Sequence, residues 1–245
     1  MIRFIAISCI LFTSPVFSAT LLLESGIKQN TLIELYTSEG CSSCPPAERF
    51  LNNLKTNNQL WDKYIPVAFH VDYWDYIGWK DPYAKKEFGL RQSHYASLKR
   101  ASTVYTPAFM VSGSSWRPGI FSKSIPEYHS QVGNLKVSIE DRNIRANYTL
   151  KHKNKYPLRL NIAILGMGLT SHIERGENEG RTAKHEFVVI GFDSKDSNDL
   201  QWNMKLPKLH FDKAEKHAIA VWVSEVNNPT PVQAVGGLLP DYKYN

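Results

Sequence analysis

The sequence predicts an α/β domain followed by an all-β, sandwich-like domain. Up to about Gly133, short apolar runs alternate with segments whose apolar residues recur at helical spacing. Beyond Gly133, only strand-like runs follow one another, with turn-forming residues between them. Two cysteines three positions apart lie between the first strand-like run and the first helix-like segment.

The first domain begins with two strands that we expect to be buried. Residues 31–38 and 65–71 are strongly apolar and have the length of strands. Between them, apolar residues at helical spacing predict a helix from about Pro46 to Asn57. A third strand is expected over residues 106–113 and is entered through Pro107.

Two further helices are predicted from capping signals. Asp81 and Pro82 resemble an N-cap with proline at the first helical position, which predicts a helix running to about Arg100. Ser124 and Glu127 form a capping box that predicts a last short helix. The strands of the second domain are predicted at residues 135–141, 144–150, 158–165, 185–192, 200–206 and 218–226.

The chain is expected to be exported. Residues 1–19 have a basic start, a short apolar stretch and small residues at their end, which is typical of a secretory signal peptide. The apolar stretch is shorter than the roughly 20 residues that span a bilayer. We therefore expect a secreted or periplasmic protein with a signal peptide at 1–19, an α/β domain at 20–134 and a β-rich domain at 135–245.

Composition narrows the function further. The chain is 42% hydrophobic and 21% charged, as globular proteins are. Its net charge of +6 is scattered, without a basic stripe interleaved with aromatic residues, so no nucleic-acid partner is expected. Cys9 falls in the predicted signal peptide, which leaves one cysteine pair in a compartment where disulfides persist. No motif predicts a cofactor, and the sequence predicts no oligomeric state.

Cys41 and Cys44 form a C-x-x-C motif that carries the functional prediction. A strand, a C-x-x-C and a helix in this order are the layout of a thioredoxin-like redox site. Cys41 is the predicted nucleophile, and Cys44 is expected to resolve the mixed disulfide. Glu39 and Pro45 oppose activation, because one brings negative charge and the other delays the start of the helix.

Other roles for the cysteine pair remain open. A structural disulfide would stabilise little, because a four-residue loop hardly constrains the unfolded chain. Two thiolates and a histidine such as His70 could hold Cu(I), which prefers soft ligands. A zinc site usually needs four ligands, and the sequence has no second C-x-x-C.

Further site residues are predicted near the ends of the strands. The resemblance to thioredoxin-like folds, in which a cis-proline faces the C-x-x-C, implies that Thr106–Pro107 is a cis bond that orients substrate. His70 and Asp72 follow the second strand, where α/β sites gather, and Asp72 is a predicted proton relay. The alternative for both is a solvated strand end.

Two charged or aromatic segments complete the predicted site. Trp74 and Trp79 belong to an aromatic stretch that could bind a peptide, with core packing as the alternative. Residues 174–181 are a charged, glycine-bracketed segment that predicts a long hairpin connection. Its alternative is a loop over the first domain's site, with Arg181 and His185 supplying polar contacts.

Several longer stretches carry a family resemblance. At residues 34–47, 68–82, 104–107 and 176–182, the chain resembles the exported, thioredoxin-like family catalogued as domain of unknown function 1223. The resemblance implies a thioredoxin-like N-terminal domain and a β-rich C-terminal domain, and it implies no settled activity.

The expected function is therefore that of an exported thiol–disulfide oxidoreductase. Its partners would be exported thiol or disulfide proteins and a membrane redox partner. The alternative is a copper- or peptide-binding module whose cysteines ligate a metal or only staple the loop.

Overall fold

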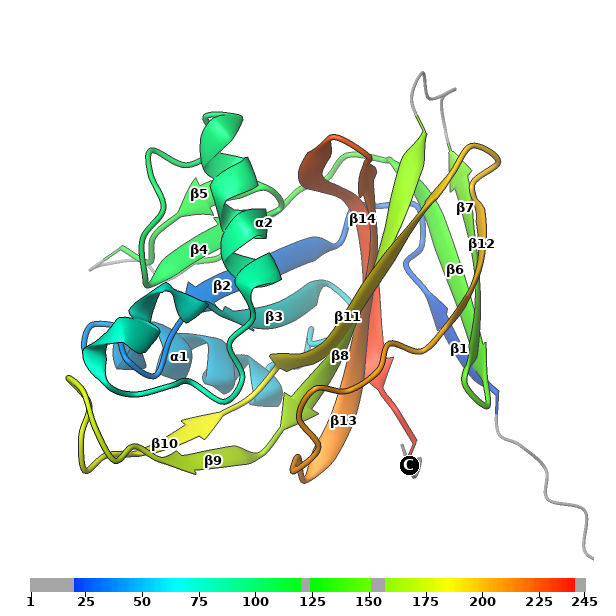
Figure 1. The fold of residues 1–245 in the computed structure, drawn as a ribbon. Helices are drawn as coiled ribbons and strands as arrows, with labels where there is room; N and C mark the ends of the chain where they lie inside the picture. The colour runs from blue at the N-terminus through cyan, green and yellow to red at the C-terminus, as the bar shows by residue number, and fades with distance from the viewer. Residues whose placement is uncertain (1–19, 120–123, 151–156, 241–245) are drawn as a thin grey trace, which may run out of the picture.

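One mixed sheet of eight strands runs through both halves of the chain (Figure 1). The structure, a computed structural model, describes residues 20–119, 124–150 and 157–240. The strands of this sheet are β2 (Thr31–Thr37), β3 (Tyr64–His70), β4 (Ala108–Val111), β5 (Ser114–Trp116), β8 (Leu158–Met167), β11 (Val188–Ser197), β13 (Lys216–Glu225) and β14 (Asn228–Leu238). Across the sheet their order is β14-β13-β8-β11-β3-β2-β4-β5.

Helices pack against the β3-β2-β4 part of the sheet. β2 and β3 are parallel neighbours buried along their whole lengths, which explains why both are continuous apolar runs. The helical segments are α1 (Pro45–Asn52), the 3-10 helices η1 (Asn53–Thr56) and η2 (Asp72–Ile77), and α2 (Lys86–Ser97). Leu51 of α1 and Phe88 and Tyr95 of α2 share one apolar core with these strands.

A second, four-stranded antiparallel sheet packs on the C-terminal part of the large sheet. Its strands are β1 (Leu21–Glu24), β6 (Gly133–Glu140), β7 (Asn143–Leu150) and β12 (Gln201–Lys205), in the order β1-β6-β7-β12. Every second residue of β6 is buried, so Leu135, Val137 and Ile139 meet Ile162 and Ile164 of β8 in a second core. A separate hairpin, β9 (Leu169–His172) and β10 (Thr182–His185), extends past α1 (Figure 1).

The predicted fold class, a thioredoxin-like α/β domain followed by an all-β domain, is wrong. Strands make up 46% and helices 14% of the described residues, and strands from both sides of residue 134 lie in one sheet. β11 runs parallel to β3 with Val188 opposite Ala68, and the Ala68 N–H donates to the Phe187 carbonyl at 2.8 Å. Apolar patterning identifies strands, but it does not identify which strands pair.

The predicted boundary between the two domains falls within a strand. The boundary at residue 134 falls inside β6 and stays a prediction about which parts fold independently. The predicted signal peptide, residues 1–19, lies outside the described residues.

Two predicted capping signals do not begin helices. Asp81 is buried away from α2, which begins at Lys86, because its carboxylate accepts hydrogen bonds from the backbone N–H groups of Glu39 and Tyr83. Residues 124–130 are not helical. There the Glu127 carboxylate is bound by Lys63 and by the Tyr64 hydroxyl instead of capping a helix.

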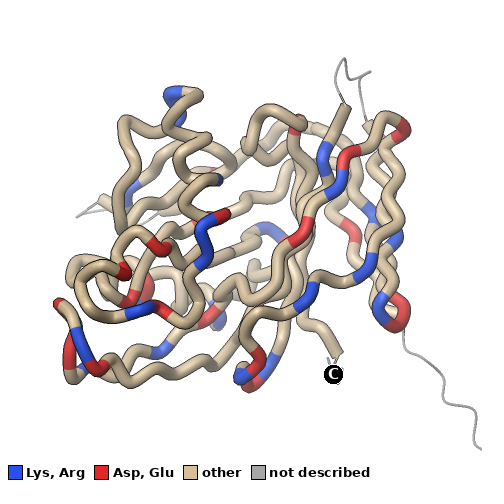
Figure 2. The backbone as a smooth tube through the Cα atoms, in the orientation of Figure 1, with Lys and Arg blue, Asp and Glu red and all other residues tan. Residues whose placement is uncertain are grey.

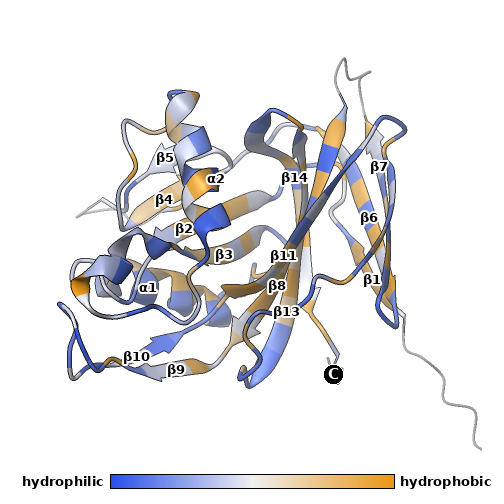
Figure 3. Cartoon of the chain, in the orientation of Figure 1, coloured by the Kyte–Doolittle hydropathy of each residue, from blue (hydrophilic) through white to orange (hydrophobic). Residues whose placement is uncertain are grey.

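Charge and hydropathy are distributed as in a globular protein. Basic and acidic residues are interspersed along the chain (Figure 2). Hydrophobic stretches lie along β8, whereas the tip of the β9–β10 hairpin is hydrophilic (Figure 3). Within the described residues, no helix is long and apolar enough to cross a membrane.

Candidate functional site

The C-x-x-C motif forms a disulfide-bonded turn between β2 and α1. Cys41 and Cys44 are joined by a disulfide. The Cys44 N–H donates to the Cys41 carbonyl at 3.1 Å, and Cys44 is the N-cap of α1. Pro45 occupies the first helical position, where the missing N–H has no helical partner to lose. The helix therefore begins directly after the second cysteine.

Both cysteines are fully buried, with 0% exposure, although the two serines between them are exposed. The loop of the β9–β10 hairpin lies over the turn. The Asn178 side-chain amide donates to the carbonyls of Glu39 at 2.8 Å and Cys41 at 3.0 Å. The Ser42 N–H donates to the Glu177 carboxylate at 3.1 Å. The segment 174–181 is thus both a hairpin connection and a cover for the C-x-x-C turn.

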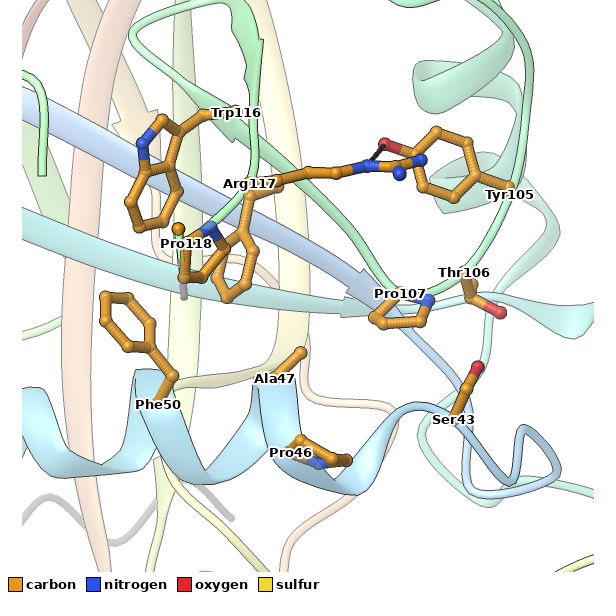
Figure 4. Close-up of a pocket in the computed structure, with 12 residues that line it drawn as sticks. Ser43, Pro46, Ala47, Phe50, Tyr105, Thr106, Pro107, Trp116, Arg117 and Pro118 are labelled. Carbon is orange, nitrogen blue, oxygen red and sulfur yellow. Dashed lines mark hydrogen bonds between the residues drawn. The ribbon is translucent and has the colours of Figure 1, made fainter. Parts of the chain in front are cut away.

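A pocket of about 550 Å³ lies on one side of this turn (Figure 4). Its lining residues are Ser43, Pro46, Ala47, Phe50, Tyr105, Thr106, Pro107, Phe109, Trp116, Arg117, Pro118 and Gly119. The Ser43 side chain points toward Thr106 and Pro107 (Figure 4), and the Thr106–Pro107 bond is cis, as predicted. At the far end lie the rings of Phe50 and Trp116, whose centroids are 5.5 Å apart. The pocket thus joins the C-x-x-C turn to an aromatic wall.

One further wall of this pocket is basic and aromatic. The Arg117 guanidinium lies 5.0 Å from the centre of the Tyr105 ring. The Trp74 indole N–H donates a hydrogen bond to the Thr106 hydroxyl at 2.6 Å and so fixes the position of this side chain. Trp74 therefore supports the pocket and is not itself one of its lining residues.

A buried polar cluster lies on the other side of the turn. Nδ1 of His70 is 2.7 Å from the Asp81 carboxylate, and Nε2 of His185 is 2.9 Å from that of Glu39. The Trp79 indole N–H also donates to Glu39, at 2.8 Å. His70 and Trp79, both predicted to bind substrate, are thus placed in this cluster and not in the aromatic pocket.

The ion pair between His70 and Asp81 changes the pKa values of both side chains. Burial by itself lowers the pKa of His70. The negative charge and hydrogen bond of Asp81, and then the charges of Glu48 and Glu39, raise that pKa to about 9. Burial likewise acts to raise the pKa of Asp81, and the neighbouring imidazolium outweighs it, so this pKa is lowered. The pair is charged at neutral pH.

Asp72 is not one of the residues that line the aromatic pocket. It begins η2, and its carboxylate lies beside Gly89 of α2. Among the described residues, no hydrogen bond joins Asp72 to either cysteine. Its predicted role as a proton relay stays a prediction.

Sequence reasoning missed three residues of the site: Glu48, Asp81 and Asn178. Glu48 had a usable signal, because it follows Cys44 by four positions on a helix and therefore lies on the same face. Asp81 gave a misleading signal as an N-cap. Asn178 gave none, since its partners are 137 and 139 positions away in the sequence.

Comparison with known proteins identifies a family and a fold. The family model described as protein of unknown function (DUF1223) matches residues 32–224. No curated protein matches the chain. The crystal structure of protein AGR_C_4864 from Agrobacterium tumefaciens is similar, with 18% identity, a TM-score of 0.59, and coverage of 87% of this chain and 95% of that one.

A second solved structure, HBP35 of Porphyromonas gingivalis, has 15% identity and a TM-score of 0.55. The match covers 88% of this chain and 76% of HBP35. At these identities, both likenesses concern the fold alone.

Proposed function

This chain belongs to the DUF1223 family, and we propose that it is an exported thiol–disulfide oxidoreductase with Cys41 and Cys44 as its redox pair. One observation carries the proposal. The disulfide-bonded turn forms part of the wall of an aromatic pocket large enough for a side chain or a short peptide segment. A disulfide that served only as a staple would need no such pocket.

The reaction is thiol–disulfide exchange. A thiolate of a reduced partner attacks the Cys41 sulfur, the Cys41–Cys44 bond breaks, and Cys44 leaves as a thiolate. A second partner thiolate then attacks the partner's sulfur in the mixed disulfide and expels Cys41. The partner gains a disulfide, and the two electrons reside on the Cys41–Cys44 dithiol. In the opposite direction, the Cys41 thiolate attacks a partner disulfide, and Cys44 releases the reduced partner.

The pocket indicates the class of partner. Phe50, Trp116 and Pro107 offer apolar surface, and Arg117 offers a cation beside it. An extended segment of an exported protein, with its cysteine near Ser43 and an apolar residue nearby, suits this lining. A membrane redox partner would restore the oxidation state of the pair after each exchange.

Trapping of the mixed disulfide tests the proposal. In the mature Cys44→Ser chain the resolving thiol is absent, so a cysteine-containing peptide disulfide should leave its peptide on Cys41, detected by intact mass. The matched Cys41→Ser chain should capture much less, and the double variant sets the background. If neither single variant captures peptide when native, while both do so in urea, the cysteines are inaccessible in the folded protein and the proposal is wrong.

A further inference from the structure

We propose that Glu48, His70 and His185 form a binding site for a divalent transition-metal ion, with Zn²⁺ as the expected occupant. The site lies in the polar cluster beside the C-x-x-C turn. It uses no cysteine, so it goes beyond the proposed redox function and does not depend on it.

The three side chains have the spacing of metal ligands. One ligand atom from each residue lies within 4.8 Å of the others. Nδ1 of His185 and the Glu48 carboxylate are 3.5 Å apart. Zinc ligands about 2.1 Å from the ion in a tetrahedral arrangement lie roughly 3.4 Å from one another. The pair formed by His185 and Glu48 already has this separation.

A buried nitrogen without a partner points into the cluster. The His70 side chain is 1% exposed, and its Nε2 has no hydrogen-bond partner. Its other ring nitrogen, Nδ1, is held by Asp81 at 2.7 Å. An unsatisfied buried polar atom is costly and rare, so it calls for a ligand. A metal ion bound at Nε2 would displace the proton that this nitrogen carries in the imidazolium and would satisfy the atom.

Each ligand is oriented by an outer hydrogen bond. Nδ1 of His70 is bound to Asp81, and Nε2 of His185 is bound to Glu39 at 2.9 Å, which leaves the opposite ring nitrogen of each histidine for a metal. The Thr37 hydroxyl donates to one Glu48 oxygen at 2.6 Å and leaves the second free of this bond. Carboxylate–histidine–metal arrangements of this kind are the usual surroundings of protein zinc.

The charges of the cluster also favour a cation. The carboxylates of Glu39, Glu48 and Asp81 surround only two imidazoles, so even two protonated rings would leave one carboxylate unbalanced. Among the described residues, no lysine or arginine forms an ion pair with these three. Buried charges are normally paired or bound to metals, and a divalent ion would supply the missing positive charge.

The types of ligand suit Zn²⁺, and a pocket connects the site to solvent. Two imidazoles and one carboxylate are a ligand set found in zinc sites that keep a fourth position open. A pocket of about 510 Å³ borders Glu48 and His185 and offers entry from solvent. Arg49, Arg181 and Lys184 also line it, so the fourth position would accept water or a small anion.

A metal titration tests the proposal. The untagged mature protein, with its disulfide intact, is stripped with a chelator and titrated with Co²⁺, whose visible absorption reports coordination. We expect one Co²⁺ per chain, displaced by one Zn²⁺. Glu48→Gln and His185→Gln should each weaken Zn²⁺ binding by more than about 100-fold, since even outer-shell changes cost 10–100-fold. The His172→Asn chain is the matched control, because that histidine is exposed on the same hairpin and should leave binding unchanged.

Three outcomes would overturn the site. The wild-type protein could bind neither ion in stoichiometric amounts. Binding could persist at wild-type affinity in the Glu48→Gln chain. The Glu48 side chain is 12% exposed, and near-ultraviolet circular dichroism verifies that this variant is folded. Binding could also require prior reduction of the disulfide and be absent from a Cys41→Ser, Cys44→Ser chain, which would assign the metal to the two thiolates. If the Cys41→Ser, Cys44→Ser chain still binds the metal, the site does not depend on the redox pair, whether or not that pair is active.

Discussion

His210 shows how burial sets the charge of a single residue. Its ring lies against Phe88, and Nε2 is 3.3 Å from the Tyr83 carbonyl. Burial, and then the positive charge of Lys85, lowers the pKa of His210 to about 4. The imidazole is therefore neutral in the folded protein at pH values where the unfolded chain would bind a proton.

This difference predicts a loss of stability in mild acid. Between its unfolded pKa of about 6.5 and its folded pKa of about 4, His210 binds more protons in the unfolded state, so the free energy of unfolding falls as the pH falls. His210→Gln should remove the contribution of His210 to this decrease in the free energy of unfolding, because glutamine can donate to the same carbonyl without titrating. Urea unfolding of the wild-type and variant chains from pH 7 to pH 4 measures the free energy of unfolding of each. Parallel stability curves for the two chains would contradict the assignment.

At the residue scale, local sequence signals failed where a side chain had a distant partner. Asp81 has the sequence context of an N-cap, yet its carboxylate binds His70, 11 positions away. Glu127 has the context of a capping box, yet it binds Lys63. In both cases the carboxylate also has a distant partner and no helix follows, although Asp81 keeps the local hydrogen bond from the Tyr83 N–H.

The β9–β10 loop connects the elements around the disulfide. Asn178 is buried and holds two carbonyls of the C-x-x-C segment, while Glu177 holds the Ser42 N–H. Because both sulfurs are fully buried, a reductant reaches them only when such contacts open locally. The loop should therefore control how fast the disulfide reacts.

Asn178→Ala should accelerate reduction of the Cys41–Cys44 disulfide by dithiothreitol about 30-fold, since its two hydrogen bonds to the turn are worth about 1 kcal/mol each. Stopped-flow fluorescence or quenched mass analysis would give the rates. Glu179→Ala is the control, because that residue is exposed in the same loop. Equal rates for wild type and Asn178→Ala would mean that the loop does not gate the disulfide.

Strands could be predicted from the sequence wherever they are apolar along their length. The cores of β2, β3 and β8 were all predicted from their apolar runs. β14 was not predicted, because Pro229, Pro231 and two glycines interrupt its pattern. β14 is an edge strand of the large sheet, where a missing N–H costs no ladder bond, so prolines are tolerated there.

The whole molecule is built around a sheet that crosses the predicted domain boundary. Phe69 of β3 packs on Trp222 of β13, with ring centroids 6.5 Å apart, in one core. Asn30 donates its side-chain amide to the Ala234 carbonyl at 2.9 Å. The sequence could not reveal these pairings, because nothing in a strand's own residues states which distant strand lies beside it.

A fragment of residues 20–134 should therefore fail to fold cooperatively. It would expose the edge of β3 that pairs with β11 and the apolar surface that Trp222 covers. Near-ultraviolet circular dichroism and urea unfolding of this fragment, beside the chain of residues 20–245, test the expectation. A sharp two-state transition in the fragment would establish it as an independent domain.

The reduction potential of the Cys41–Cys44 pair decides whether this disulfide is redox-active or structural. The chain of residues 20–245 is equilibrated with glutathione buffers of defined ratio, and the fraction of disulfide is measured by thiol alkylation and mass spectrometry. We predict a couple that exchanges with glutathione, at a potential between about −120 and −270 mV, the range of known disulfide donors and reductants. A pair that stays oxidised below about −300 mV and exchanges with no thiol would be a structural disulfide, and the chain would then not be a thiol–disulfide oxidoreductase.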